Sequence, residues 1–429
     1  MSTGVGSTDV LAGLDIGSSQ VRVIVAETVE NRVERILGVG AVPAQGVKRG
    51  AIVNVDQVVD SIGRACDDVS AQIGIRPQSV YVGVHTAQIT LLDSHGVVGV
   101  GNEGQEITAD DVDRVLRAAE VVALPPERTI LSVQPKQFIV DGLDEIESPH
   151  GMMGVRLEVD ALLVTASKQK MQNLFRCVER AGLRVRGGIF FPLAEGAFCL
   201  TEEERFQGVL LINLGGGVTT VTIFERGHLA AVAVLPLGAE YVTNDIAIGL
   251  RVSSGVAEEI KRKYAVSSRE YASHKDFFFV RSEGAEEDQK VTLQDLARIV
   301  EPRMEETFQL IREHVQGLGF CPNPPGGCVI TGGGAALSHV AHTAQRQLGT
   351  TVRIAVPPGA GSQNSSRLGC VSMVYWLQRY PELWTDIRQD PVVAVGGSQK
   401  SLLTKYTEPN KQQRNSPLRR VRNWLSEFM

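Results

Sequence analysis

The stretch VLAGLDIGSSQVRVIVA, residues 10–26, decides the fold of this chain. It predicts a β-hairpin, because apolar and β-branched residues on both sides of a GSSQ turn fit strands buried in a sheet. Gly17 lets a ligand approach the backbone closely, and Ser18 and Ser19 offer hydroxyl and N–H groups that suit phosphate oxygens. Asp15 precedes the turn, where a hydrated Mg²⁺ would stand beside a bound phosphate. For one isolated hairpin, an ordinary tight turn is the alternative.

The same pattern returns twice. Residues 209–224, VLLINLGGGVTTVTIF, again predict a strand, a glycine-rich turn and a strand, and residues 328–335, CVITGGGA, end a strand in glycines before a helix. The glycines of these turns are Gly215, Gly216, Gly217, Gly332, Gly333 and Gly334. Three glycine-tipped strand ends suggest two similar half-domains around a nucleotide. The two hairpin turns would hold the phosphates, and the third turn would lie near the base.

Composition limits the functional classes. With 429 residues, of which 43% are hydrophobic, the chain is long enough for several domains with large cores. A formal net charge of -6 argues against nucleic acid as a partner. The cysteines show no metal-binding spacing and favour a reducing compartment. The start MSTGVGSTDV predicts no signal peptide, and no stretch approaches the roughly 20 apolar residues of a membrane span, so a cytoplasmic body is predicted.

Changes of pattern divide the chain. Strands alternate with helices up to residue 84, after which short strands at 88–92 and 97–100 and a capped helix after Thr108 indicate a small inserted α+β subdomain. The predicted segments are 8–84, 166–204 and 363–395 for the first half; 85–165 for the insertion; 205–239 and 318–362 for the second half; 240–317 for its small, largely helical subdomain; 396–417 for a flexible linker; and 418–429 for a C-terminal helix.

The C-terminal stretch 418–429 has the pattern of an interfacial membrane helix, because large apolar side chains recur at helical spacing opposite basic ones. The residues predicted to meet the membrane are Leu418, Arg419, Arg420, Val421, Arg422, Trp424, Leu425 and Phe428. From 411 to 429 there are five basic residues and one acidic one, which favours anionic lipid. The alternative is a terminal helix that docks on the protein's own body.

These motifs carry a family resemblance. The three glycine turns resemble the phosphate and adenosine motifs of the actin, Hsp70 and sugar-kinase superfamily. Residues 134–165, together with AQGVKRGAIV at 44–53 and IVEPRM at 299–304, closely resemble the FtsA family of bacterial actin-like cell-division proteins. The resemblance implies a two-lobed actin-like α/β fold, with the inserted subdomain in the first half and a C-terminal amphipathic helix.

The resemblance also implies a function. Members are ATP-binding adaptors that self-associate into filaments on the inner face of the cytoplasmic membrane at the division septum. They bind the C-terminal peptide of the tubulin-like FtsZ and recruit later division proteins, and residues near 85–165 would contact a neighbouring subunit and those proteins. A small-molecule kinase of the same superfamily and an actin-like pilus-assembly adaptor remain as alternatives. The membrane-type tail at 418–429 argues against both.

The resemblance assigns roles to individual residues. Asp15 would meet Mg²⁺, the turns 17–19 and 215–217 would line the ATP phosphates, and 332–334 would pass beneath the base. Glu258 and Lys261, in AEEIK, would contact the adenosine, with a solvated helix face as the alternative. Arg298 and Arg303 would meet the acidic FtsZ peptide, because guanidinium groups pair well with carboxylates. An internal salt bridge is the alternative for Arg303.

Three positions depart from the family pattern. Asn213 and Thr220 stand where acidic residues are usual near the second phosphate turn, and Leu162 replaces a histidine of the insertion. Asn213 can bond a metal-bound water but supplies no charge. No general base stands out in the sequence, and no catalytic residue is assigned. Mg·ATP binding with slow or undetectable hydrolysis is therefore expected.

Overall fold

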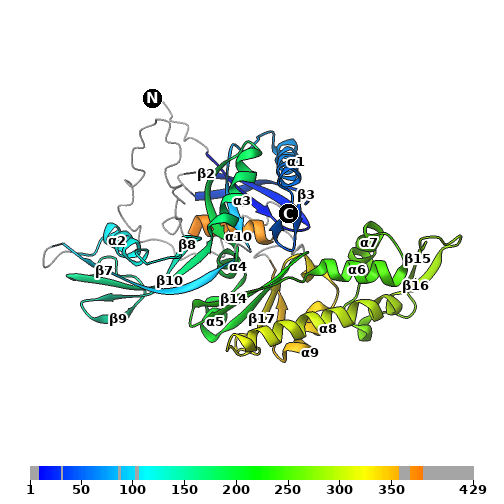
Figure 1. Cartoon of the computed structure of the whole chain (residues 1–429). Coiled ribbons are helices and arrows are strands. Elements are labelled where there is room, and N and C mark those ends of the chain that lie inside the picture. The colour runs from blue at the N-terminus through cyan, green and yellow to red at the C-terminus, as the bar shows by residue number, and fades with distance from the viewer. Residues whose placement is uncertain (1–8, 30–31, 86–87, 102–105, 357–367, 380–429) are drawn as a thin grey trace.

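The computed structural model describes residues 9–29, 32–85, 88–101, 106–356 and 368–379, and it divides into two lobes with one inserted subdomain (Figure 1). The first lobe is built on a five-stranded sheet in the order β11-β6-β1-β2-β3. Its strands are β1 (Asp9–Ile16), β2 (Gln20–Val29), β3 (Arg32–Pro43), β6 (Ser79–Val84) and β11 (Arg184–Phe190). The antiparallel hairpin β1–β2 stands in its middle, as predicted.

Helices cover both faces of the first sheet. On one face, α1 (Val55–Ile73) and α3 (Lys168–Arg180) share a buried core with β1, β2 and β6. On the other, α4 (Phe191–Cys199) and α10 (Leu368–Arg379) pack together. Helix α1 begins where Asn54 accepts a hydrogen bond from Gln57 N–H and ends at Gly74, in the left-handed conformation that favours glycine. A short ribbon, β4 (Val47–Lys48) with β5 (Ala51–Ile52), precedes α1.

The second lobe repeats this arrangement in the order β14-β13-β12-β17-β18. Its strands are β12 (Val209–Leu214), β13 (Thr219–Glu225), β14 (His228–Leu235), β17 (Cys328–Thr331) and β18 (Val352–Ile354). In both sheets, the first strand along the chain pairs antiparallel with the second and parallel with the fourth. The turns β1–β2 and β12–β13 therefore occupy equivalent positions in the two lobes.

Further elements complete the second lobe. The helices are α5 (Glu202–Gln207), α6 (Ala239–Leu250), α7 (Ser254–Tyr264), α8 (Leu293–Gly317) and α9 (Val340–Leu348), with short 3-10 helices η1 (Arg269–Tyr271) and η2 (Gly333–Ala336). The region predicted as largely helical also contains a hairpin, β15 (Phe277–Val280) with β16 (Gln289–Thr292), at the far end of α8 (Figure 1).

The insertion is a four-stranded antiparallel sheet in the order β7-β10-β8-β9 with one helix, α2 (Ala109–Ala119), on one face. Its strands are β7 (Thr90–Gly99), β8 (Arg128–Val140), β9 (Leu143–Ile146) and β10 (Arg156–Ser167). The prediction of two short strands at 88–92 and 97–100 is wrong, because β7 is continuous. Gly96 lies within this strand and is needed where α2 comes close: a Cβ there would lie 2.4 Å from the Val115 carbonyl oxygen.

No helix within the described ranges is both long and apolar enough to cross a bilayer. The predicted linker 396–417 and C-terminal helix 418–429 lie outside the described residues.

Candidate functional site

A cavity of about 360 Å³ lies between the lobes, and its lining brings most of the predicted site together. The predicted residues that line it are Asp15, Gly17, Ser18, Ser19, Gly215, Gly216, Gly217, Gly332 and Gly333. Gly334 is not among the lining residues and packs against Leu214, where a Cβ would lie 2.6 Å from Leu214 Cδ2. Turns from three separate parts of the sequence therefore converge on one space, as the repeated motif predicted.

The two hairpin turns touch each other across this cavity. A Cβ on Gly216 would lie 2.7 Å from Ser19 Oγ, and a Cβ on Gly217 would lie 2.7 Å from Ser18 Oγ. Both distances are shorter than real contacts allow, so glycine is required for this approach. At the third turn Gly332 adopts a φ of 83°, which favours glycine over any residue with a side chain.

Asp15 is buried beside two basic groups. His85 Nε2 lies 2.8 Å from Asp15 Oδ1, and Arg22 Nη1 donates to Asp15 Oδ2 at 3.2 Å. Burial alone would raise the pKa of Asp15, but His85 and then Arg22 outweigh it and hold the pKa below its usual value. The carboxylate is therefore ionised at neutral pH. Sequence reasoning found Asp15 but missed His85, which follows β6 and has no local motif.

The chemistry of this donor set fits Mg²⁺. That ion takes oxygen ligands and is usually bound through one or two carboxylates together with substrate phosphates. Asp15 supplies one ionised carboxylate at the cavity, and the glycine turns leave room for phosphate oxygens beside it. Within the described residues there is no group of three or more His, Cys, Asp or Glu side chains arranged to hold a metal on their own. The metal would therefore depend on the phosphates of a bound nucleotide.

Glu195 is a cavity residue that sequence reasoning missed. It projects from α4, is only 2% exposed, and accepts hydrogen bonds from Asn213 Nδ2 at 2.8 Å to each carboxylate oxygen. Thr331 Oγ1 also donates to it at 3.1 Å. Burial raises the pKa of Glu195 to about 7, although these hydrogen bonds act against it. A signal was present, because Glu195 is the one charged residue in the otherwise apolar helix FPLAEGAFC.

This carboxyl group has the properties of a general base, since its pKa lies near neutral pH and it faces the cavity. It also changes the expected role of Asn213. The amide of Asn213 donates to Glu195, so Asn213 holds the buried carboxyl in place. Thr220, the second departure from the family pattern, lines the cavity as well.

Glu258 and Lys261 lie outside the cavity lining. Lys261 Nζ is 2.6 Å from Glu258 Oε2, and it donates to Thr243 Oγ1 at 2.7 Å and to the Ala239 carbonyl at 3.0 Å. Lys261 is only 9% exposed, so a solvated helix face does not describe it. The pair joins α7 to the start of α6, directly behind the second hairpin turn.

Arg303 makes the internal ion pair that was considered for it. Its Nε and Nη2 atoms donate to the two carboxylate oxygens of Asp245 at 2.5 and 3.0 Å, and Nη1 bonds Glu306. Arg298, one turn earlier on α8, is exposed and pairs with Asp295 of the same helix at 3.2 Å. Both arginines therefore lie on α8, with Arg303 held against α6 and Arg298 facing solvent.

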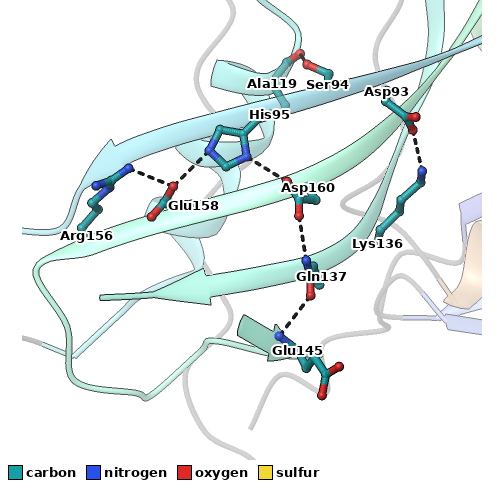
Figure 2. A network of polar contacts seen from close by, with 10 residues as sticks. All are labelled: Asp93, Ser94, His95, Ala119, Lys136, Gln137, Glu145, Arg156, Glu158 and Asp160. Atoms are coloured by element: carbon teal, nitrogen blue, oxygen red, sulfur yellow. Dashed lines mark hydrogen bonds and ion pairs between the residues drawn. The ribbon is translucent and has the colours of Figure 1, made fainter. Parts of the chain in front are cut away.

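The insertion carries a second polar network, on the sheet face opposite α2 (Figure 2). His95 Nδ1 is 2.8 Å from Asp160 Oδ1, and His95 Nε2 is 3.0 Å from Glu158 Oε2. Because both partners are carboxylates, each ring nitrogen has to donate, which requires the imidazolium form. The hydrogen bond with Asp160 raises the pKa of His95, and this effect outweighs that of partial burial, which acts to lower the pKa. This ladder ties β7 to β10, and Gln137 extends it to β8.

The fold and this cavity define an actin-like protein. A solved structure titled PilM-PilN type IV pilus biogenesis complex matches 85% of this chain and 96% of its own, with a TM-score of 0.53 and 16% identity. MreB5 of Spiroplasma citri bound to ADP matches 87% of this chain and 97% of its own, with a TM-score of 0.52 and 11% identity. At such identities the likeness shows the fold alone, and it confirms the predicted actin-like architecture.

Sequence comparison identifies the family. The model for the SHS2 domain inserted in FtsA matches residues 86–165, and the model for cell division protein FtsA matches residues 210–369. FtsA of Bacillus subtilis (strain 168) is 41% identical over 373 residues, covering 87% of this chain and 84% of the relative. FtsA of Escherichia coli (strain K12) is 31% identical, covering 81% of this chain and 84% of the relative. The chain belongs to the FtsA family of cell division proteins.

Proposed function

We propose that this cell division protein is an ATP-binding adaptor that tethers the FtsZ ring to the inner face of the cytoplasmic membrane, self-associates into filaments and recruits later division proteins. The observation that carries the proposal is the convergence of glycine turns from both lobes on the ionised Asp15. An actin-like protein of the same fold, MreB5 of Spiroplasma citri, has been solved with ADP and with AMPPNP. The proposal is tested by asking whether the protein carries a labelled FtsZ C-terminal peptide to anionic liposomes.

In this proposal the phosphates of ATP bind at the turns 17–19 and 215–217, which line the cavity and include the hydroxyl groups of Ser18 and Ser19. Asp15 would hold a hydrated Mg²⁺ beside those phosphates. The turn 332–334 runs beneath the base, and Glu258 with Lys261 supports the adenosine side from behind α6. When bound, Mg²⁺ neutralises phosphate charge, and the chain itself supplies positioning and one buried carboxyl group.

Slow ATP turnover is expected, below roughly 1 s⁻¹, because Asn213 and Thr220 bring no charge to the phosphates. Glu195→Gln should lower the remaining rate by about 100-fold, the effect of losing a general base, while ATP still binds. Because the pKa of Glu195 is about 7, its basic form increases as pH rises, so the wild-type rate should rise through pH 7. Steady-state phosphate release measured from pH 6 to 8 checks both statements.

Two results would contradict this expectation. A wild-type rate well above 1 s⁻¹ would remove the argument from Asn213 and Thr220. A Glu195→Gln variant that keeps both the wild-type rate and its rise with pH would show that Glu195 is only a buried structural group.

The partner surface is proposed on α8. Arg298 is exposed there, and Arg303 retains a side chain exposed by 30% beside its pair with Asp245. Arg303→Glu should weaken binding of the acidic FtsZ peptide at least about tenfold, because it replaces a favourable charge contact by a repulsive one. Fluorescence anisotropy with a labelled peptide measures this. Arg312→Glu, an equal charge change farther along α8, is the matched control and should bind normally.

Because Arg303→Glu also breaks the pair with Asp245, its thermal unfolding has to be compared with that of wild type. If the variant is folded and binds the peptide as wild type does, the assignment of Arg303 to the FtsZ surface is refuted. The internal ion pair with Asp245 would then be its whole role.

A small-molecule kinase remains a second candidate, favoured by one observation: a kinase needs a carboxyl base beside its phosphate turns, and Glu195 has that position. A kinase or an adaptor without a membrane tail would leave the FtsZ peptide in the supernatant when liposomes are pelleted. Transfer of labelled phosphate from ATP to a small acceptor would favour the kinase.

A further inference from the structure

Tyr241, at the start of α6 in the second lobe, has guanidinium groups from two other elements over its ring. The Cζ atom of Arg49, in the first lobe, is 5.8 Å from the ring centroid. The Cζ atom of Arg303, on α8, is 5.6 Å from it. Both distances fall within the range of cation–π attraction. The stack therefore joins the first lobe, through α6, to the proposed partner surface.

Arg49 is fixed at the edge of the cavity. It is in the β4–β5 turn with a φ of 48°, a left-handed conformation uncommon for residues other than glycine. The next residue, Gly50, donates its N–H to Ser18 Oγ at 3.0 Å. The backbone nitrogen of Arg49 also lies 3.2 Å from the position that a Cβ on Gly217 would take. Arg49 is thus held beside the first hairpin turn through Gly50, and its backbone lies against the second turn.

The two residues before Tyr241 are bound to the second hairpin turn. Ala239 N–H donates to the Gly215 carbonyl and Glu240 N–H to the Gly216 carbonyl, both at 2.9 Å. The start of α6 must therefore follow any movement of that turn. Arg303 is in turn held to α6 by its bidentate pair with Asp245. The contact between Arg49 and Tyr241 therefore joins the loop beside the first turn to the helix behind the second, next to the cavity but outside its lining.

We propose that the stack of Arg49 on Tyr241 couples nucleotide binding between the lobes to the α8 surface around Arg303, so that ATP changes the affinity for an acidic peptide. This inference rests on the proposed function, because it connects the proposed nucleotide and peptide sites. A ligand shifts an equilibrium only through contacts that differ between two states. The stack is such a contact, since it depends on the separation of the two turns. Arg49 and Tyr241 act as positioning residues and need not touch either ligand.

The test measures the Kd of the protein for the FtsZ C-terminal peptide with and without saturating Mg·ATP. The ratio of these two Kd values reports the coupling. Arg49→Ala and Tyr241→Leu should each move this ratio about 2- to 5-fold toward one, the loss expected for an exposed cation–π contact. Tyr241→Phe retains the ring and should restore the wild-type ratio. Lys48→Ala removes the neighbouring exposed cation, at the end of β4, and is the matched control.

Hydrogen–deuterium exchange supplies a readout that does not need the peptide. Mg·ATP should slow exchange in both hairpin turns, in α6 and in α8 of the wild type. In Arg49→Ala the protection of the turns should remain, and that of α8 should be lost. This pattern distinguishes the loss of coupling between the turns and α8 from a failure of the variant to fold or to bind nucleotide.

The possible outcomes are distinguishable. If the wild type binds no ATP, or no peptide, the proposed function fails and this inference fails with it. If it binds both but the ratio is one, or if Arg49→Ala and Tyr241→Leu keep the wild-type ratio and the α8 protection, the coupling is overturned while the proposed function stands.

Discussion

Removal of residues 418–429 is expected to release the protein from anionic liposomes almost completely. Each basic residue near an anionic surface contributes about 1 kcal/mol, and each large apolar side chain that becomes fully buried adds roughly 1.5–3 kcal/mol. Ordering the helix takes back a good part of this total, so binding of one tail should be reversible. A filament that presents many tails should bind more strongly. Co-sedimentation with vesicles containing anionic lipid measures the loss.

A double substitution, Trp424→Glu with Leu425→Glu, should have the same effect as the truncation, because it places charge in the apolar face of the helix. Ser426→Ala, in the same turn, is the control and should pellet normally. High salt should weaken binding of the intact protein, and ATP binding should be unchanged in all variants. If the truncated protein pelleted as well as the intact one, the tail would not be the anchor, and a helix docked on the protein's own body would replace this interpretation.

Asp15→Ala should weaken Mg²⁺-dependent ATP binding by about tenfold or more, since it removes the ionised carboxylate from the lining of the cavity that the first two turns share. The loss should be largest with Mg²⁺ present and small with a chelator, because the proposed contact is to the hydrated metal. Isothermal titration with a slowly hydrolysed ATP analogue, with and without Mg²⁺, measures both affinities.

Asp160→Asn is a suitable control for Asp15→Ala, because Asp160 is also paired with a histidine but lies in the insertion, outside the cavity lining. It should leave nucleotide affinity unchanged. Thermal unfolding of Asp15→Ala has to be followed too, since Arg22 and His85 lose their partner. Unchanged affinity in a folded Asp15→Ala would show that Asp15 only stabilises the turn and its two basic neighbours.

The parts of the fold that could be predicted from the sequence are those that depend on neighbouring residues in the chain. The turns at 17–19 and 215–217 combine glycine with flanking strands rich in β-branched residues, so the sequence predicted both hairpins. Their meeting across one cavity followed from the repetition of the motif, and the actin-like arrangement followed from the family resemblance. Helix starts such as Thr108, with its capping box to Asp111, were visible for the same reason.

The missed features depend on contacts between distant segments. Glu195 and His85 reach the cavity only because α4 and the end of β6 meet there, and their hydrogen-bond partners come from distant parts of the sequence. The pair of Arg303 with Asp245 joins α8 to α6. The sequence alone left both an internal ion pair and a partner contact open for Arg303, because it does not show which residues lie beside it. The sequence predicted two short strands where β7 is continuous, because the approach of α2 to Gly96 within that strand is a contact between distant segments.

In the proposed function, one molecule holds the FtsZ peptide and the membrane at the same time. The most direct measurement is the fraction of labelled FtsZ C-terminal peptide that pellets with anionic liposomes, with the wild-type protein, with Arg303→Glu and with the truncation of 418–429. The peptide should pellet only with the wild type, Arg303→Glu should pellet without peptide, and the truncated protein should keep the peptide in the supernatant. Peptide that fails to pellet with a membrane-bound wild-type protein, or that pellets equally well with the truncated one, would refute the tethering role.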